Sequence, residues 1–482
     1  MSNSGRFLEV LTLDQVRQIH LTALRVLEEV GLWLPCREAL ELLDDTGAWV
    51  DFAAQTARIP AHLVEACLQR IPPRFTWYAR DPAYCLDMNG IDTFFAAPDS
   101  AIDVIDLEGR RRSGTVRDGE AICRLCDALP NLACTSTGVH PPEMPEAMQV
   151  AWFTMTMYTQ SSKAVFGVSR NKAISLQVLR MAEVVADACD HLPAGELPLI
   201  AVTNTVSPLY NTPHQLEGML EYIRRGVPLL ISPEVQAGAT GPATLAGTLV
   251  QATAEFLGHA TIAELLTPGL PLMYGCVSSV FDMKRMMLAY GAPAADLLCI
   301  ATAQMARYYG IPSRGTGGSS DANALGMQAG VESLMSNLAC VVAGITYVCH
   351  AAGELQNTLA VSYEKTVLDD EIIGMARRFA KGIEVTPETL AFDVIKEVGP
   401  RGHFLGTDHT MRHFRTEQFL PDLLVRDKYD VWEAAGGKRA EERARDRVHE
   451  LLAKHQPKPL PGEAILELES VYTSAKRSAG VE

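Results

Sequence analysis

Short apolar runs alternate with longer stretches of helical periodicity through the middle of the chain, from about residue 93 onward. Such runs, bounded by turn-forming residues, are typical of buried strands, whereas apolar residues at helical spacing are typical of amphipathic helices. The eight candidate strands are Thr93–Pro98, Leu132–Val139, Ala164–Ser169, Leu199–Val206, Pro228–Pro233, Pro271–Val277, Ile311–Gly315 and Ile345–Cys349. The helices expected around them are Thr115–Leu129, Ala147–Gln160, Ala173–Ala188, His214–Arg225, Pro242–Leu266, Pro293–Tyr309, Gly326–Ala343 and Lys365–Ala380.

This alternation predicts an α/β protein whose core, residues 93–382, is a (β/α)8 TIM barrel. A doubly wound open sheet is the main rival architecture. It is less favoured because no G-x-G-x-x-G sequence follows the first candidate strand.

The segments before and after this core show different patterns of apolar and polar residues. Residues 1–92 carry three helical patterns and one strand-like stretch, which predicts a mainly helical N-terminal cap with a small β component: Thr12–Val30, Arg37–Gly47, Pro60–Ile71 and Phe75–Met88. Residues 383–482 predict a C-terminal helical extension packed on the barrel, with helices at Thr386–Glu397 and Lys438–His455. The second of these helices mixes both charge signs and is interpreted as a solvated surface helix.

Composition narrows the class of protein. The 482 residues are 48% hydrophobic and 21% charged, with a net charge of −16, so nucleic-acid binding has no electrostatic support. No basic leader and no uncharged apolar run of membrane-spanning length is visible, and the eleven cysteines are scattered. We therefore expect reduced thiols in a cytoplasmic protein. Cys123 and Cys126 form a CxxC, but no second pair at zinc-site spacing accompanies them.

Polar residues that could bind a ligand lie at the C-terminal ends of the expected strands, where the active sites of barrel proteins lie. Arg314 follows the seventh strand and His350 the eighth, so the two side chains could hold a small anion between them. The alternative is a surface arginine in a loop and a hydrogen-bonded histidine in the core. Asn204 and Glu234 lie at two other strand exits.

Aromatic residues in the strands suggest what kind of anion this would be. Phe94, Phe95 and Tyr274 could form a cage for a quaternary ammonium group, although each is individually more often a core residue. Arg314 would bind a carboxylate by donating two hydrogen bonds to it. A carboxylate and a methylated ammonium in one small molecule describe a betaine.

Several familiar catalytic patterns are absent: the chain has no G-x-S-x-G, no Walker A loop and no H-E-x-x-H. His409 and His413, at positions i and i+4, could bind a metal on one helix face. The flanking Arg412 and Arg415 instead favour a polar network, and no metal site is predicted. Glycines at 315, 317 and 318 keep a phosphorylated substrate open as a further option.

Seven stretches of the chain resemble the trimethylamine methyltransferase (MttB) family, and specifically its members without pyrrolysine, the glycine betaine:corrinoid type. The resemblance extends over nearly the whole chain. It rests on Asp282–Pro293, Ala306–Ala322, Met327–Ser333, Cys349–Asn357, Leu368–Gly374, Glu397–Arg415 and Lys428–Ala444, of which CHAAGELQN and EVGPRGHFLGTDHTMRHFR are two examples.

The resemblance implies a TIM barrel that works with a cobalamin-carrying partner protein and transfers a methyl group to Co(I). It also implies that Arg314 and His350 match carboxylate-binding positions. Trimethylamine is an unfavourable substrate on this reading, because the enzymes that use it carry pyrrolysine and this chain has none. Asn323 is a guess for the equivalent position, and no catalytic residue is assigned.

The sequence therefore predicts a methyltransferase that demethylates a quaternary amine, most simply glycine betaine, onto a corrinoid protein. The substrate-binding residues are expected to be Arg314, His350, Phe94, Phe95 and Tyr274. The corrinoid is expected on the partner protein rather than bound stably by this chain, and the chain is expected to form a homo-oligomer. The alternatives are the same chemistry on another betaine, such as proline betaine or carnitine, and a non-catalytic betaine-binding barrel.

Overall fold

A computed structural model of the chain describes residues 7–106 and 108–481; part of the N-terminal stretch searched for a leader lies outside this range. All eight expected strands form, and they pair in parallel in one curled sheet. Their bounds are β6 Phe94–Ala96, β9 Leu132–Cys134, β10 Phe166–Val168, β11 Ile200–Asn204, β12 Leu229–Ser232, β14 Leu272–Gly275, β17 Ser313–Thr316 and β18 Tyr347–Cys349. The protein is thus an α/β protein with a TIM-barrel-like fold.

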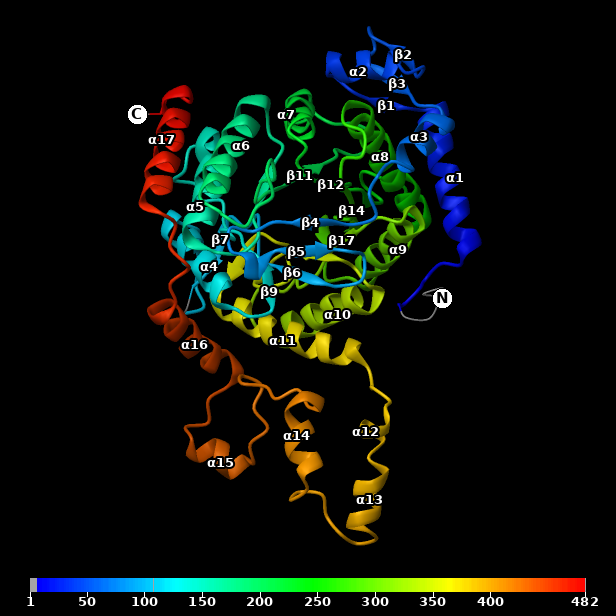
Figure 1. The fold of residues 1–482 in the computed structure, drawn as a ribbon. Helices are drawn as coiled ribbons and strands as arrows, with labels where there is room; N and C mark the ends of the chain where they lie inside the picture. Colours follow the sequence, from blue (N-terminus) through cyan, green and yellow to red (C-terminus); the bar gives the residue numbers. More distant parts are fainter. Residues whose placement is uncertain (1–6, 107, 482) are drawn as a thin grey trace.

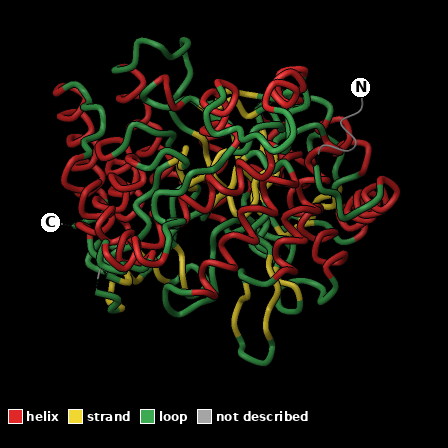
Figure 2. The backbone as a smooth tube through the Cα atoms, turned by 90° about the horizontal axis from the view of Figure 1, so that it is seen from below, coloured by secondary structure: helices red, strands yellow, loops and turns green. Residues whose placement is uncertain are grey.

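The strand order is β10-β11-β12-β14-β17-β18-β6-β9, so β6, the first strand in sequence, lies between β18 and β9. The two ends of this order approach each other: a parallel bridge joins Cys134 to Ala164, and the Thr135 amide donates to the Ala164 carbonyl at 3.2 Å. Figure 2 shows the strands gathered near the centre, with helices around them.

Helices cover the outside of the sheet, one after each of the eight strands (Figure 1). They are α4 Val116–Ala128, α5 Glu146–Gln160, α6 Lys172–Asp187, α7 Pro213–Arg224, α8 Leu245–Leu266, α9 Pro293–Tyr309, α10 Met327–Ala343 and α11 Tyr363–Lys381. Helix α8 is mainly apolar and is buried on nearly all sides, because it packs between the sheet and two N-terminal helices, α1 (Leu13–Glu29) and α3 (Ala61–Leu68). Within the described residues, no helix is both long and apolar enough to span a bilayer.

The N-terminal segment is mainly helical with small β elements, as its pattern indicates. It contains α1 Leu13–Glu29, β1 Leu32–Trp33, α2 Arg37–Asp44, β2 Trp49–Asp51, β3 Thr56–Arg58, α3 Ala61–Leu68, β4 Phe75–Trp77 and β5 Leu86–Met88. From the β4–β5 hairpin, the buried Trp77 donates its indole N–H to the Val165 carbonyl at 3.0 Å and packs edge-on against Tyr347. The hairpin therefore covers the end of the sheet where the strands begin.

The C-terminal segment is helical, but its first helix differs from the expectation. The pattern at Thr386–Glu397 gives two short helices because Ala391 adopts a left-handed φ of 49° and ends the first after one turn. The bounds are α12 Pro387–Leu390, α13 Phe392–Val398, α14 Asp408–Glu417, α15 Tyr429–Ala434, α16 Ala440–Lys454 and α17 Gly462–Ser478. Helices α12 to α15 extend away from the sheet (Figure 1).

Short strands inserted after four of the sheet strands were not anticipated. They are β7 Asp103–Ile105, β8 Arg111–Ser113, β13 Gln236–Ala237, β15 Ser279–Asp282, β16 Met287–Ala289, β19 Glu354–Leu355 and β20 Ala360–Ser362. Strands β7, β8, β19 and β20 pair with one another, so the segments after the first and last sheet strands form one small sheet.

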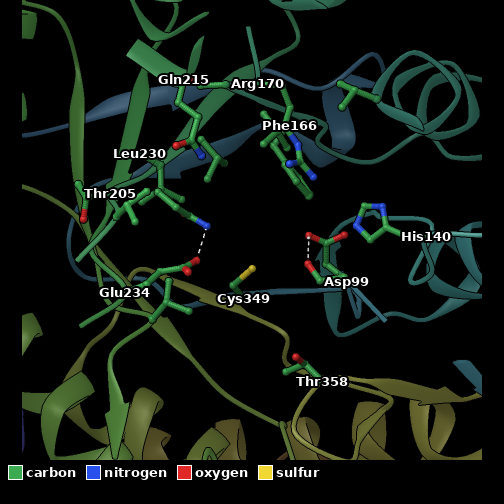
Figure 3. A pocket seen from close by; sticks show the side chains of 18 of the residues that line it. Asp99, His140, Phe166, Arg170, Thr205, Gln215, Leu230, Glu234, Cys349 and Thr358 are labelled. Atoms are coloured by element: carbon green, nitrogen blue, oxygen red, sulfur yellow. Dashed lines mark hydrogen bonds between the residues drawn. The ribbon is translucent and has the colours of Figure 1, made fainter. Parts of the chain in front are cut away.

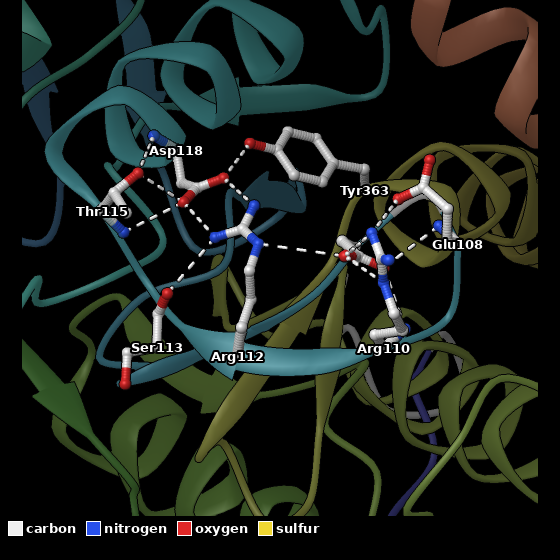
Figure 4. Close-up of polar contacts among 8 residues, drawn as sticks. Glu108, Arg110, Arg112, Ser113, Thr115, Asp118 and Tyr363 are labelled. Atoms are coloured by element: carbon white, nitrogen blue, oxygen red, sulfur yellow. Dashed lines mark hydrogen bonds and ion pairs between the residues drawn. The ribbon is translucent and has the colours of Figure 1, made fainter.

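A network of polar groups ties this small sheet to the helices (Figure 4). Arg112 on β8 forms two hydrogen bonds of 2.6 and 2.8 Å to the Asp118 carboxylate on α4. Tyr363, at the start of α11, donates its hydroxyl to the same carboxylate at 2.7 Å. Burial raises the pKa of Asp118, but Arg112 and the hydroxyl donors outweigh burial and lower it to about 2.

Replacing Asp118 by Asn is expected to reduce the free energy of unfolding at pH 7 by about 2–3 kcal/mol, because a native pKa near 2 stands below the ordinary 3.8. The native pKa is the lower one, so this stabilisation is complete above about pH 4 and is lost as the pH falls toward 2. Urea unfolding at pH 7 and pH 2.5 measures both effects. Asp446→Asn, at an exposed ion pair with Lys438, is the control and should change little. Equal effects of the two substitutions would contradict the assignment.

Candidate functional site

A cavity of about 1240 Å³ opens where the strands of the sheet end. The C-terminal ends of the eight strands, or the segments that follow them, contribute to its wall, which is the arrangement that a TIM-barrel-like fold produces at its functional end. One representative from each segment is Asp99, His140, Arg170, Asn204, Glu234, Val277, Thr316 and His350. Figure 3 shows side chains from distant parts of the chain, including Asp99, Phe166, Glu234 and Cys349, around one open space.

Arg314 lines this cavity from β17, and only 5% of its surface is exposed. Its Nη1 donates to the Cys276 carbonyl at 2.6 Å and to the Thr316 hydroxyl at 3.3 Å. Its Nε is shielded from solvent and has no hydrogen-bond partner among the described residues. A guanidinium is charged at any pH that the protein meets, and all of its N–H groups are donors. Because Nε has no partner, part of this donor capacity remains unused at the cavity wall.

His350 lines the same cavity from the end of β18 and adopts a left-handed φ of 57°. For a residue with a Cβ atom this conformation is costly, and such strain concentrates at functional sites. Its Nδ1 lies 2.7 Å from Oε1 of the fully buried Glu354. Glu354 also accepts hydrogen bonds from the Asp99 amide and the Ser319 hydroxyl. Since Nδ1 is engaged, Nε2 is the nitrogen that His350 can offer to a ligand.

Arg314 and His350 make the cavity wall at the ends of β17 and β18, here called the anion-binding corner, a favourable environment for an anion. Burial lowers the pKa of His350, but Cys349 and Glu354 more than offset burial and raise it well above its ordinary value. Burial raises the pKa of the Cys349 thiol, yet His350 and Arg314 outweigh burial and bring it down to about 7. The Cys349 shift is caused by the positive charge of Arg314 and His350, whereas the His350 shift is caused by the negative charge of Cys349 and Glu354. The structure thus brings Arg314 and His350 to one wall, as the sequence suggested.

Asn204 and Glu234, the other polar residues noted at strand exits, also line the cavity. The Asn204 amide donates to the Glu234 carboxyl group, and this bond is drawn in Figure 3. Burial raises the pKa of Glu234, while Arg314 and His350 lower it in part. The cavity therefore contains a carboxyl group as well as two basic side chains.

The three aromatic residues expected as an ammonium cage are not among the residues that line the cavity. Side chains alternate between the two faces of a strand, and two of the three face the surrounding helices. Tyr274 donates or accepts a hydrogen bond with Thr253 on α8 and stacks on Phe256 at 4.1 Å. Phe95 is fully buried beneath the guanidinium of Arg377. Phe94 lies beside Tyr347 in the sheet but does not reach the cavity.

Other aromatic rings take their place in the wall: Phe153, Phe166, Tyr290 and Tyr347. Phe153 and Phe166 meet edge to face, with ring centroids 5.2 Å apart. Phe166 and Tyr347 lie in strands that the sequence predicted, so alternation along those strands could have found them. Phe153 comes from a helix and Tyr290 follows the inserted strand β16, and no sequence signal marked either.

The glycines after β17 have a packing explanation. The amide of Gly317 donates to the Cys349 carbonyl and that of Gly318 to the Ser336 hydroxyl. Gly318 has a φ of +70°, and a Cβ atom there would lie 2.0 Å from the Ala351 carbonyl oxygen. These N–H groups are not free to bind phosphate. Asn323, in the same loop, is exposed and is not among the lining residues.

The comparisons with known proteins cover the chain almost end to end. The family described as trimethylamine methyltransferase (MTTB) matches residues 1–481. A glycine betaine methyltransferase of Desulfitobacterium hafniense (strain Y51) is 33% identical over 98% of this chain and 98% of its own length. The trimethylamine methyltransferase MttB of D. hafniense (strain DSM 10664 / DCB-2) is 33% identical over 97% of this chain and 94% of its own. The crystal structure of the Methanosarcina barkeri monomethylamine methyltransferase (MtmB) matches with a TM-score of 0.48 and 11% identity, covering 93% of this chain and 89% of that one.

Proposed function

The chain belongs to the trimethylamine methyltransferase (MttB) family, and from that premise we propose that it demethylates glycine betaine and passes the methyl group to a corrinoid protein. The product would be dimethylglycine. One of its full-length relatives at 33% identity bears the name glycine betaine methyltransferase, which supports this substrate class.

The single observation that carries the substrate assignment is the buried guanidinium of Arg314 on the cavity wall, with an unpartnered Nε. A desolvated cation with an unused donor favours an anionic ligand, because a buried donor without a hydrogen-bond partner is costly. A carboxylate is the anion whose two oxygens match a guanidinium best. We propose that Arg314 binds the carboxylate of the substrate.

His350 would supply a second donor to the same carboxylate from the neighbouring strand. Its pKa is raised by Cys349 and Glu354 against the effect of burial, which favours the protonated ring, in which both nitrogens are donors. Glu354 occupies Nδ1 and fixes the orientation of the ring. We propose that Nε2 hydrogen-bonds the carboxylate.

The methylated ammonium group would lie among the aromatic rings of the cavity wall. Phe153, Phe166, Tyr290 and Tyr347 replace Phe94, Phe95 and Tyr274 as the proposed cage. An aromatic face attracts a quaternary ammonium through its quadrupole, and the carboxyl group of Glu234 would add a negative partner.

The cavity has room for a second molecule at its mouth. Its volume of about 1240 Å³ exceeds what a molecule as small as glycine betaine fills, which fits the approach of a corrinoid carried by a partner protein. When bound, the corrinoid supplies the cobalt nucleophile that takes the methyl group. This chain would hold the substrate, orient one methyl group toward the mouth and exclude water.

The absence of an obvious general acid is consistent with this substrate. A quaternary nitrogen already carries a full positive charge and leaves as a neutral tertiary amine, so no proton has to be delivered to it. Positioning and desolvation are then the main tasks of the protein.

We further propose that residues 93–382 form a closed (β/α)8 catalytic barrel, that residues 1–92 and 383–482 are its two appended parts, and that the chain forms a homo-oligomer.

A panel of methyl donors tests the proposal. The purified chain is incubated with free cobalamin reduced to Co(I) and with glycine betaine, proline betaine or carnitine, and methylcobalamin and singly demethylated product are followed by absorbance and mass spectrometry. We expect glycine betaine to be the best donor. A higher rate with a longer betaine would move the assignment to that substrate, and tight betaine binding without any transfer would identify a non-catalytic binding protein.

A further inference from the structure

Three side chains that could ligate a metal meet far from the cavity, in the part of the chain that extends away from the sheet. Glu388 lies on α12, and His409 and His413 lie one turn apart on the same face of α14. One donor atom from each lies within 4.8 Å of the others. Nε2 of His413 is 3.1 Å from Oε1 of Glu388, and the two imidazole rings are 4.5 Å apart. The sequence pairs the histidines, but only the fold adds Glu388.

The second imidazole has an unused nitrogen. Nε2 of His409 is shielded from solvent and has no hydrogen-bond partner among the residues that the structure describes. A buried ring nitrogen normally has a partner, since leaving it without one costs free energy. Its ring lies 4.5 Å from that of His413, which itself contacts Glu388.

The surroundings explain why such a ligand would matter. No residue between 383 and 418 is buried, so helices α12, α13 and α14 have no hydrophobic core of their own. One ion pair, from Arg378 to Glu417, ties the far end of α14 to α11. Small structural units that lack a core commonly depend on a metal or another cross-link.

We propose that Glu388, His409 and His413 bind one divalent transition-metal ion of the zinc class, which joins α12 to α14. Two imidazoles and one carboxylate are a ligand set that zinc uses with water in the fourth position. Ligand atoms about 2.0–2.2 Å from a zinc ion lie at most about 4.4 Å apart. The three donor atoms lie within 4.8 Å of one another, close to this spacing.

One cation at present competes for this position. Nη1 of Arg412 lies 2.7 Å from the same Oε1 of Glu388. The side chain of Arg412 is 60% exposed and can turn into solvent when a metal arrives. Removing this competitor should therefore strengthen metal binding.

Zinc titration of the full-length protein tests the proposal. After treatment with a chelator and dialysis, the protein is titrated with ZnCl2 by calorimetry, and tryptic cleavage within residues 383–418 is followed with and without zinc. We expect one equivalent of zinc to bind and to slow cleavage. His409→Ala and His413→Ala should weaken binding at least about tenfold, since even the loss of an outer partner has such an effect. Arg412→Gln should tighten it.

His403→Ala is the matched control, because His403 is exposed in the loop between α13 and α14 and is not part of the cluster. It should leave zinc binding and protection unchanged. Binding that survives in the double variant His409→Ala/His413→Ala would assign the zinc to other donors, such as cysteines, and overturn the proposal. So would the absence of zinc-dependent protection in the unmodified chain.

Discussion

Replacing Arg314 by alanine is expected to lower kcat/KM for glycine betaine by about two to three decades. The loss corresponds to roughly 3–4 kcal/mol, the scale of removing one partner from a desolvated charged pair. Arg314→Lys keeps the charge but loses the planar fork that matches two carboxylate oxygens, so it should recover only part of the activity. Steady-state kinetics of methyl transfer to Co(I) cobalamin measure both variants.

Folding and the second donor need separate controls in this experiment. Arg314 also donates to the Cys276 carbonyl, so thermal unfolding of each variant must be compared with that of the unmodified chain. Arg447→Ala, at an exposed ion pair on α16, should leave the kinetics unchanged. His350→Ala should lose less than Arg314→Ala, and the double variant should be non-additive because both residues hold one group. Normal turnover by Arg314→Ala would refute the betaine assignment even with the fold intact.

Trimethylamine should be a very poor methyl donor compared with glycine betaine. It lacks the carboxylate, so it would not gain the pairing with Arg314 that glycine betaine gains, a difference of roughly 3–5 kcal/mol. A tertiary amine also lacks the permanent charge that makes the leaving group neutral. Rates of methylcobalamin formation at equal donor concentration should therefore differ by at least about a hundredfold.

Tetramethylammonium separates the two causes. It carries the quaternary charge but no carboxylate, so it should fall between trimethylamine and glycine betaine. Added acetate, which can occupy the carboxylate position, should raise the rate with tetramethylammonium and should not raise the rate with glycine betaine. If trimethylamine and glycine betaine were demethylated at similar rates, the proposed role of Arg314 would be wrong.

Much of the fold could be predicted because each sheet strand is a short apolar run between turn residues, and such runs have few alternative structures. The inserted strands could not be predicted in this way. Strand β8, for example, is the exposed sequence Arg111–Ser113, which pairs only because β7 lies beside it. Ala391 likewise gives no sign of the left-handed conformation that divides the expected C-terminal helix, since its conformation depends on the surrounding chain.

The residues of the candidate site likewise fall into those that the sequence could predict and those that it could not. Arg314, His350, Asn204 and Glu234 were found from sequence because polar residues at the ends of apolar strands are conspicuous, and the ends of parallel strands meet. The aromatic residues were not found, because apolar side chains occur on both faces of every buried strand. Tyr274 and Phe166 look equally suitable in sequence, yet the first faces α8 and the second faces the cavity.

Glu354 gives the anion-binding corner a further property. Its two carboxylate oxygens receive hydrogen bonds from Asp99, Ser319 and His350, which belong to the segments after β6, β17 and β18. These three segments are thus joined before any ligand arrives, so binding should freeze few additional backbone or side-chain motions. The conformational entropy lost when a ligand binds would therefore be small. The anion-binding corner would act as a preorganised site rather than one that closes around its ligand.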